Sequence, residues 1–390
     1  MEDKLNILII IAGLAIGEHF GGAEKAGAEL ACALNKKEFN PVVCAFWRRN
    51  ARSEDDWIYR LDKAGVEVFF AAEHRKNIVE YIKGIKRITC YLQNRGFDII
   101  HSHFQLGSIA AILLKKTLGA KALIRTAHAG KEWGDGPIAF LCRQVLTNWF
   151  FPFLFNVEIG VSKSIVDALD KRPGARIVGK KALLVYNAVP LDRFAFSVGN
   201  RNLARSEIGL PADSPVVGYV GRLRKEKGLT TLIDAAAIVH IHRPEVKFLI
   251  VGDGEMRDSL SERVRNLGLS DVVIFIGARQ DVEYLYQLMD LFVLPSFWEG
   301  LPIAILESMA SGVPVIATDL PGVRELILHE HTGWLVRPGD PRSLALTILE
   351  ALSDPNKCSK VAQTALQEVV LRFSLTDIAK QHENIYKRWK

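Results

Sequence analysis

Cysteine is scarce in this sequence, and no two cysteines have the spacing of a metal-binding or redox pair. The five positions are Cys32, Cys44, Cys90, Cys142 and Cys358. Without such spacing, the simplest prediction is a set of buried free thiols in a reducing cytoplasm. We also expect no signal peptide, because the first apolar run, Leu5–Ala12, is short and typical of a strand.

Long apolar runs without polar interruptions are missing as well. The most apolar window, Pro137–Val157, is interrupted by Arg143, Gln144, Asn148 and Pro152. A spanning helix needs about 20 consecutive apolar residues, so we predict that this window does not cross a membrane. Two interpretations stay open: a buried helix, which we favour, and a helix lying on a membrane surface.

Several catalytic motifs are also absent. The chain has no Asp-x-Asp, no P-loop, no nucleophile elbow and no strict Gly-x-Gly-x-x-Gly after the first strand. These absences argue against a carboxylate-held divalent ion, and they weaken the case for a nicotinamide cofactor. The histidines lack a carboxylate or cysteine at zinc-ligand spacing. We therefore predict neither a bound metal nor a cofactor.

What is present is a chain of 390 residues, 49% hydrophobic and 24% charged, which is the composition of a globular protein of about two domains. Its net charge of +6 is uneven. Residues 1–190 hold 27 Lys and Arg against 19 Asp and Glu, whereas residues 191–390 hold 23 against 25. Phosphate, anionic lipid or nucleic acid could each explain the basic first half.

Short apolar runs alternate with helical patterns along the chain, which predicts parallel strands buried on both faces. In the first half we expect strands at Leu5–Ala12, Pro41–Trp47, Val66–Phe70, Phe97–His101, Ala122–His128, Val157–Val161 and Ala182–Tyr186. A linker region, Asn187–Asp213, precedes a second series at Val216–Val220, Lys247–Val251, Val272–Ile276, Asp290–Pro295, Val313–Thr318 and Gly333–Arg337. Two helices, Lys357–Arg372 and Leu375–Trp389, end the chain. The pattern predicts two doubly wound α/β domains that face each other across a cleft.

Candidate site residues follow the strands of the second series. Arg222 and Lys227 lie in the loop after Val216–Val220, and two cations there suit a diphosphate. Glu299 precedes a helix that we predict from Pro302 to Gly312, and Glu307 lies in its second turn. The N-terminus of that helix favours an anion, and the two glutamates could form an acid–base pair. A buried Glu307 would need hydrogen-bond partners, which ribose hydroxyls could supply.

The first half offers weaker signals. Gly21 and Gly22 open a helix after the first strand, where glycine lets the backbone approach a ligand. His128 ends one strand, and His101 and His103 end its neighbour. A lone histidine is commonly structural, but three at neighbouring strand ends favour polar chemistry.

Taken together, these motifs resemble the GT-B glycosyltransferases of the large retaining family 4, also called glycosyl transferases group 1. The resemblance covers nearly the whole chain and is strongest from Val216 to Asp340. Its signature is a glutamate followed after seven residues by a second one, here Glu299 and Glu307. The matching segments are Gly21–Glu24, Gly221–Gly228, Val251–Glu255, Pro295–Gly300 and Leu306–Val315. Pro302 departs from the family, many members of which have glycine there, so one backbone N–H is missing.

The resemblance implies a GT-B fold with an acceptor domain at residues 1–190, a donor domain at 191–372 and a helix at 373–390 that crosses back to the first. It implies catalytic roles for His128, Arg222, Lys227 and Glu299. Donor contacts would come from Gly21, Gly22, Arg222, Lys227, Gly277, Arg279, Glu299, Gly300, Leu301 and Glu307. Arg222 and Lys227 would hold the diphosphate in place of a metal, Glu307 the ribose and Glu299 the sugar. His128 would contact the sugar near its 6-position, and Gly277–Arg279 would meet the base.

The implied activity is metal-independent, retaining transfer from a nucleotide-sugar, with UDP as the expected nucleotide, to a glycan or lipid-linked acceptor of polysaccharide or glycolipid synthesis. The alternatives are a sugar-nucleotide epimerase or hydrolase of the same fold, a nicotinamide-dependent two-domain enzyme and an inactive sugar-nucleotide binder. The loops Trp47–Trp57 and Gly130–Pro137 are candidates for acceptor choice. We expect a cytoplasmic protein that binds no nucleic acid. Lys83, Lys86 and Arg87 lie on one predicted helix, and two interpretations stay open for them: contact with an anionic membrane and an ordinary solvated helix face.

Overall fold

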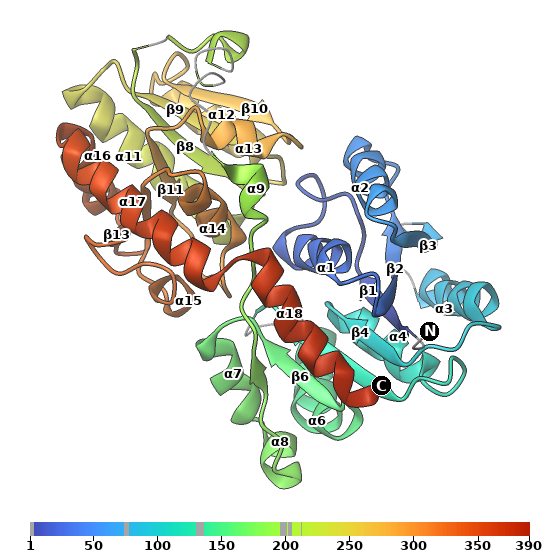
Figure 1. The fold of residues 1–390 in the computed structure, drawn as a ribbon. Helices are drawn as coiled ribbons and strands as arrows, with labels where there is room; N and C mark the ends of the chain where they lie inside the picture. The colour runs from blue at the N-terminus through green and yellow to red at the C-terminus, as the bar shows by residue number, and fades with distance from the viewer. Residues whose placement is uncertain (1–3, 74–77, 130–135, 196–200, 202–204, 212) are drawn as a thin grey trace. The chain divides into compact units, whose positions relative to one another are not determined.

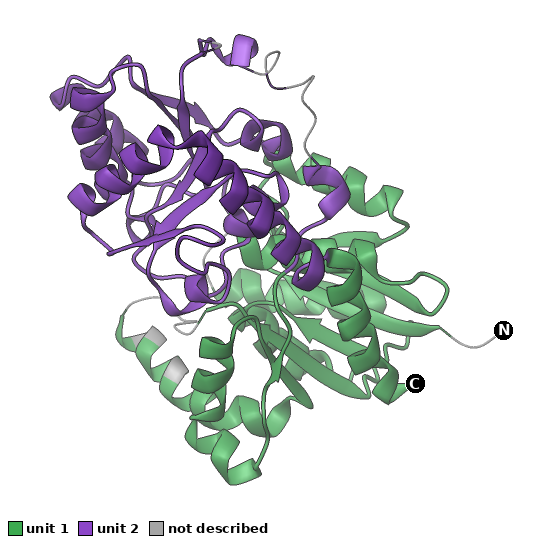
Figure 2. Cartoon of the chain, turned by 60° about the vertical axis from the view of Figure 1, so that its left-hand side comes forward, with its two compact units in different colours: residues 1–16, 20–187, 375–390 green, residues 17–19, 188–374 purple. Residues whose placement is uncertain are grey.

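The structure is a computed structural model that describes residues 4–73, 78–129, 136–195, 201, 205–211 and 213–390. The chain divides into two compact units (Figure 2). Unit 1 comprises Met1–Ile16, Phe20–Asn187 and Leu375–Lys390, and unit 2 comprises Gly17–His19 and Ala188–Ser374. The last helix of the chain therefore belongs to the same unit as the first strand.

Unit 1 is built on a parallel sheet of seven strands in the order β3-β2-β1-β4-β5-β6-β7 (Figure 1). Its strands are β1 (Leu5–Ile11), β2 (Phe39–Arg48), β3 (Glu67–Glu73), β4 (Ile99–Ser102), β5 (Ala122–Ala127), β6 (Val157–Gly160) and β7 (Leu183–Leu184). Its helices are α1 (Gly22–Ala33), α2 (Arg52–Lys63), α3 (Ile78–Leu92), α4 (Gln105–Leu114), α5 (Pro137–Cys142), the π-helix η1 (Arg143–Phe150), α6 (Phe151–Leu154), α7 (Lys163–Asp170), α8 (Pro173–Val178), α18 (Leu375–Tyr386) and the 3-10 turn η3 (Lys387–Trp389). The order reverses at β1, so the carboxyl ends of β1 and β4 form a switch point where ligands commonly bind.

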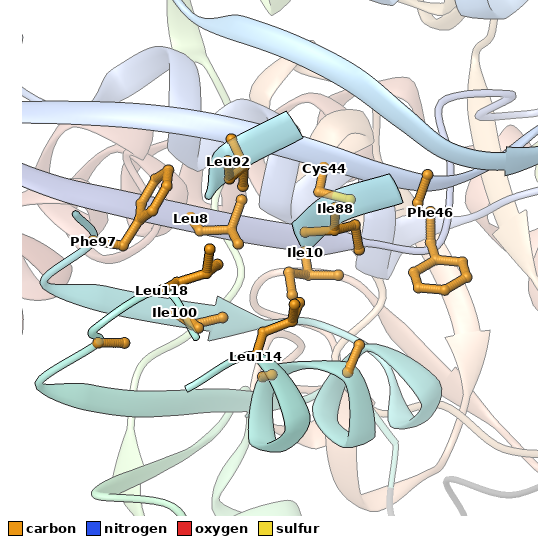
Figure 3. Close-up of a cluster of buried hydrophobic side chains, with 14 of the residues drawn as sticks. Leu8, Ile10, Cys44, Phe46, Ile88, Leu92, Phe97, Ile100, Leu114 and Leu118 are labelled. Atoms are coloured by element: carbon orange, nitrogen blue, oxygen red, sulfur yellow. The ribbon is translucent and has the colours of Figure 1, made fainter. Parts of the chain in front are cut away.

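One apolar core fills the space between this sheet and the helices on one of its faces. Side chains of β1, β2 and β4 meet side chains of α3 and α4 there (Figure 3). Leu8, Ile10 and Ile100 from the strands and Ile88 and Leu114 from the helices are almost completely buried. The strands are apolar on both faces because helices cover both, as the continuous apolar runs predict.

Unit 2 contains a parallel sheet of six strands in the order β10-β9-β8-β11-β12-β13. Its strands are β8 (Val216–Val220), β9 (Lys247–Val251), β10 (Val273–Gly277), β11 (Leu291–Leu294), β12 (Val315–Thr318) and β13 (Trp334–Val336). Its helices are α9 (Leu191–Phe194), the 3-10 turn η2 (Lys225–Lys227), α11 (Leu229–His242), α12 (Arg257–Asn266), α13 (Val282–Tyr286), α14 (Ile303–Ala310), α15 (Pro321–Arg324), α16 (Pro341–Ser353) and α17 (Pro355–Arg372). The reversal at β8 places a second switch point between the ends of β8 and β11.

Some sequence predictions need correction. Helix α14 begins at Ile303, because Pro302 is extended, with ψ at 113°, and precedes the helix. Most of the proposed acceptor loop Trp47–Trp57 is strand and helix, because β2 ends at Arg48 and α2 begins at Arg52. Glu54 caps α2 and accepts the backbone N–H of Arg49 at 2.8 Å. The other proposed loop, Gly130–Pro137, lies outside the described residues up to residue 135. Of the five thiols, only Cys44 is buried and Cys90 is exposed.

The apolar window Pro137–Val157 is helical from Pro137 to Leu154, and Val157 begins β6. Its described side chains are buried on one side only. Thr147, Phe151 and Phe155 face inward, whereas Trp149 and Phe153 are about half exposed, at 47% and 51%. The prediction of a buried helix is therefore wrong for the outer face. Periodicity could not reveal this exposure, because large apolar side chains lie on both faces. The π-helix η1 precedes Pro152, whose ring would otherwise clash with the preceding turn. No helix in the described part of the chain is long and apolar enough to cross a bilayer.

Candidate active site

Loops at the carboxyl ends of β8, β9 and β11 pack backbone against backbone in unit 2. A Cβ added to Gly228 would lie 2.0 Å from the carbonyl oxygen of Pro295, and one added to Gly252 would lie 1.9 Å from that of Gly221. The N–H of Phe297 donates to the carbonyl of Glu226 at 2.8 Å. The loop after β8 and the loop after β11 therefore form one contiguous ledge at the switch point of unit 2.

This ledge brings Lys227 and Glu299 together, although 72 residues separate them in the chain. Lys227 Nζ donates to Glu299 Oε1 at 2.6 Å, and Ser296 Oγ donates to the same oxygen at 2.7 Å. The Lys227 side chain is 19% exposed, and that of Glu299 is 9% exposed. A partly buried ammonium group at a strand end is placed to neutralise an anion.

Arg222 lies at the start of the same loop, and its backbone is held by Tyr219. The Tyr219 hydroxyl donates to the carbonyl of Arg222 at 2.9 Å, directly beneath the turn at Gly221. Burial, together with the nearby charge of Glu299, raises the pKa of Tyr219 well above its ordinary value. The phenol therefore stays protonated and keeps the turn that carries Arg222 in place.

Glu307 is buried in α14, as the sequence predicts, and its hydrogen-bond partner is Tyr286 at the end of α13. The Tyr286 hydroxyl donates to Glu307 Oε2 at 2.9 Å, and both side chains are almost fully buried. Burial and the adjacent carboxylate raise the pKa of Tyr286, so it remains a donor. Glu299 and Glu307 therefore sit in different environments, one bonded to a cation and one to a neutral phenol.

The remaining predicted donor contacts of unit 2 flank this ledge. Gly277 ends β10 with a φ of +75°, and its carbonyl accepts the N–H of Gly252 at 2.7 Å. Arg279 forms an exposed bidentate pair with Asp281. Gly300 and Leu301 are buried between Glu299 and the first turn of α14. The early N–H groups of such a helix have no intrahelical acceptor and suit a negatively charged group.

In unit 1, Gly21 and Gly22 lie where the sequence predicts, at the start of α1. The N–H of Gly21 is taken by the Glu24 carboxylate at 3.0 Å, so Glu24 caps the helix. Gly22 is the first residue of α1 and is exposed. The Gly-Gly-x-Glu motif thus combines a helix cap with an open backbone position after β1.

The three predicted histidines of unit 1 form one cluster with residues of α18. His103 Nδ1 lies 3.1 Å from His128 Nε2, and His101 bonds to Tyr386 at 2.6 Å and to Thr126 at 2.8 Å. Burial, and next His382, lowers the pKa of His128 to about 3, so its ring is neutral at physiological pH. Among the described residues, His128 Nδ1 is a buried nitrogen without a hydrogen-bond partner.

Sequence reasoning missed the residues that hold these groups in place. They are Tyr219, Tyr286, Ser296, His382 and Tyr386. Ser296 belongs to the quoted Pro-Ser-x-x-Glu-Gly motif and could have been found from its spacing to Glu299. The others lie far away in the chain or in ordinary helical patterns, where no local signal marks them.

Two doubly wound parallel-sheet units, the second with a ledge of basic and acidic residues at its switch point, are the architecture of the GT-B class of glycosyltransferases. The description "Glycosyl transferases group 1" matches residues 200–368, and "Glycosyltransferase Family 4" matches residues 20–193. The chain belongs to this family, as the sequence motifs predict.

Relatives support the family, and a solved structure shares the fold. The alpha-D-kanosaminyltransferase of Streptomyces kanamyceticus is 34% identical over 297 residues, 74% of this chain and 76% of that protein. The N-acetyl-alpha-D-glucosaminyl L-malate synthase of Bacillus anthracis is 28% identical over 340 residues, 84% of this chain and 86% of that one. Anabaena Alr3699/HepE, crystallised with UDP and glucose, has a TM-score of 0.81 at 23% identity and covers 98% of this chain and 100% of its own.

Proposed function

We propose that this protein transfers a sugar, with retention of configuration and without a metal, from a UDP-sugar to a glycan or a lipid-linked acceptor of polysaccharide or glycolipid synthesis. The observation that carries the proposal is the Lys227–Glu299–Ser296 group on the ledge after β8 and β11. HepE was crystallised with UDP and glucose, which supports UDP as the nucleotide to test first.

In this proposal, Lys227 and Arg222 bind the diphosphate and stabilise the charge that develops on the leaving nucleotide. Lys227 then exchanges part of its contact with Glu299 for phosphate oxygens. Glu307 accepts a ribose hydroxyl while Tyr286 donates to its other side. Gly277 and Arg279 meet the base, and Gly300 and Leu301 offer backbone N–H groups to the sugar or phosphate.

Retention through a covalent enzyme intermediate would need a carboxylate free to attack the sugar. Glu299 suits that role poorly, because one of its oxygens already accepts hydrogen bonds from both Lys227 and Ser296. We therefore propose attack on the same face as departure. The bond from the sugar's anomeric carbon to the phosphate oxygen breaks, the acceptor oxygen bonds to that carbon, and the acceptor's proton passes to the phosphate.

His128 is proposed to hydrogen-bond a hydroxyl of the donor sugar as a neutral ring, since its lowered pKa keeps it unprotonated. Gly21 and Gly22 are proposed to let the backbone approach the diphosphate at the start of α1. The N–H of Gly22 is the proposed donor, because the N–H of Gly21 is bonded to Glu24. Neither role requires proton transfer by the protein.

A screen of nucleotide-sugars, with mass-spectrometric detection of released nucleotide and of products, tests the proposal. We expect release of UDP that depends on an acceptor. Lys227→Ala should lower transfer about 100-fold or more, because it removes a charge that stabilises the transition state. Lys225→Ala, an exposed lysine of the same turn, is the matched control and should retain activity.

Other outcomes would point elsewhere. Near-normal turnover in Lys227→Ala would overturn the diphosphate assignment. A free sugar or an epimerised nucleotide-sugar without acceptor would indicate the hydrolase or epimerase instead. Thermal stabilisation by NAD or NADP, and by no nucleotide-sugar, would indicate a nicotinamide enzyme.

A further inference from the structure

The helices on one face of the unit 1 sheet differ from the rest of that unit in what they expose. Helices α3 and α4 contribute side chains to the core against this face (Figure 3). The segment η1–α6 contributes Leu146 and Phe151 to the same core. Helix α8 packs directly on η1, since a Cβ at Gly174 would lie 2.6 Å from the carbonyl oxygen of Trp149. These elements form one layer, and their outer sides form one continuous face of unit 1.

The outer side of this layer is rich in large apolar side chains. In η1 and α6, Trp149, Phe150 and Phe153 are 47%, 52% and 51% exposed. Further exposed members are Ile78, Val79 and Ile82 on α3, Leu113 on α4, Phe140 and Leu141 on α5, Val145 on η1, Leu154 on α6 and Ile177 on α8. We call this set, with the basic residues named next, the apolar–basic face. Exposed apolar groups gathered on one face mark an interaction surface.

The charge on the same layer has one sign. Helix α3 exposes Lys83, Lys86 and Arg87, and its only acidic residue, Glu80, is buried beside Lys83. Helices α4 and α8 and residues 136–154 contain no Asp or Glu, and α8 exposes Arg176. By contrast, α2 alone carries four acidic residues, Glu54, Asp55, Asp56 and Asp62. The apolar–basic face therefore combines aromatic side chains with positive charge and lacks exposed acidic groups.

We propose that the apolar–basic face docks unit 1 on the surface of an anionic lipid bilayer. Trp and Phe side chains enter the boundary between headgroups and acyl chains, while Lys and Arg pair with lipid phosphates. A second copy of the chain is a poorer occupant, because a two-fold contact through this face would bring like charges together. The donor chemistry proposed above is not needed for this inference, since docking is measured without a nucleotide-sugar.

Co-sedimentation of the full chain with vesicles tests the docking. We expect binding to vesicles that contain phosphatidylglycerol and weak binding to phosphatidylcholine alone, with a clear decrease between about 20 mM and about 500 mM salt. The triple variant Trp149→Ser, Phe150→Ser, Phe153→Ser should bind at least about tenfold more weakly. Lys86→Glu with Arg87→Glu should lose the preference for anionic vesicles.

The matched control removes apolar groups that are at least as exposed but lie in unit 2. Ile241→Ser with Leu371→Ser changes side chains that are 78% and 76% exposed, and this variant should bind like the wild type. If the triple variant fails to fold, the Trp149→Phe variant is used to test the docking instead. That conservative protein should still bind, but it should show less fluorescence quenching by brominated acyl chains than the wild type does.

The docking proposal is overturned if the wild type stays in the supernatant with both kinds of vesicle at low salt. It is also overturned if the folded triple variant binds as tightly as the wild type. A wild-type dimer that the triple variant converts to monomer, with no vesicle binding, would instead assign this face to contact between copies.

Discussion

At the residue scale, the two glutamates of the family signature differ in the hydrogen bonds that they can still form. Glu299 is held by an ammonium and a hydroxyl on one oxygen, whereas Glu307 accepts a hydrogen bond from Tyr286 inside the fold. Because burial keeps the pKa of Tyr286 high, the phenol donates at all ordinary pH values. Glu307 is thus oriented as an acceptor, which is what binding of a ribose hydroxyl requires.

This orientation predicts the effect of Tyr286→Phe. Loss of a buried hydrogen bond to a carboxylate should lower the free energy of unfolding by about 1.5–3 kcal/mol, measured by urea denaturation. The affinity for UDP, measured by calorimetry, should fall several-fold because Glu307 loses its fixed position. Tyr284→Phe, on the same helix but exposed, should change neither value. If Tyr286→Phe binds UDP as tightly as the wild type, the orientation of Glu307 by Tyr286 does not contribute to donor binding.

At the scale of elements, glycine sets the shape of the ledge after β8. Gly228 has a φ of +64° and lies against the carbonyl of Pro295, so it fits only because it has no side chain. Lys227 directly precedes it and reaches Glu299 across the same contact. The position of the ammonium group therefore depends on how closely two loops approach.

Gly228→Ala tests this dependence, and Gly268→Ala provides a control with nearly the same backbone angle. Gly268 has a φ of +68° but open space around its Cβ, so alanine there should cost about 1–2 kcal/mol of unfolding free energy. Gly228→Ala adds a clash and should cost more, roughly 3 kcal/mol or above, and should also weaken UDP binding. If the two variants lose equal stability and Gly228→Ala still binds UDP normally, the close approach of Gly228 to Pro295 does not determine the position of Lys227.

At the scale of the whole chain, the last helix is tied to the sheet of unit 1 by buried polar groups. His101 on β4 bonds to Tyr386 on α18, 285 residues away, and His382 stacks near His101 with its Nδ1 on the carbonyl of Ile378. Burial lowers the pKa of His382 to about 4 and of His128 to about 3, and it also lowers those of His101 and His103. The fold therefore holds four neutral rings.

Acid should weaken this attachment. A histidine with a folded pKa below its unfolded value of about 6.5 binds a proton more readily when unfolded, so stability is lost as pH falls from 6.5 toward the folded pKa. Each such ring contributes up to about 1.4 kcal/mol per pH unit in that window. Urea denaturation at pH 7.5 and pH 5.5 should show the loss.

Two variants distinguish the contribution of the buried histidine cluster to acid sensitivity from that of an exposed histidine. His382→Gln should reduce the difference between the two pH values, whereas His331→Gln, at an exposed position of unit 2, should leave it unchanged. A wild-type stability that is flat from pH 7.5 to pH 5.5 would rule out buried neutral histidines as the source of acid sensitivity.

The sequence alone determined the two doubly wound units, the order of their elements, the family and the positions of Arg222, Lys227, Glu299 and Glu307. Buried parallel strands need continuous apolar runs, and loops at strand ends need particular residues, so both leave local signals. The start of α14 was misplaced by one residue, because proline suits both the first helical turn and the position before it.

Only the tertiary structure decided which side chains meet. Lys227 pairs with Glu299 because β8 and β11 are neighbours in the sheet, and His101 meets Tyr386 because α18 returns to unit 1. The outer face of η1 and α6 is exposed because no other described element covers it, although it carries the large apolar side chains of Trp149, Phe150 and Phe153. Sequence periodicity predicts the secondary structure of a segment. Its tertiary contacts and the exposure of its side chains depend on elements that lie far away in the chain.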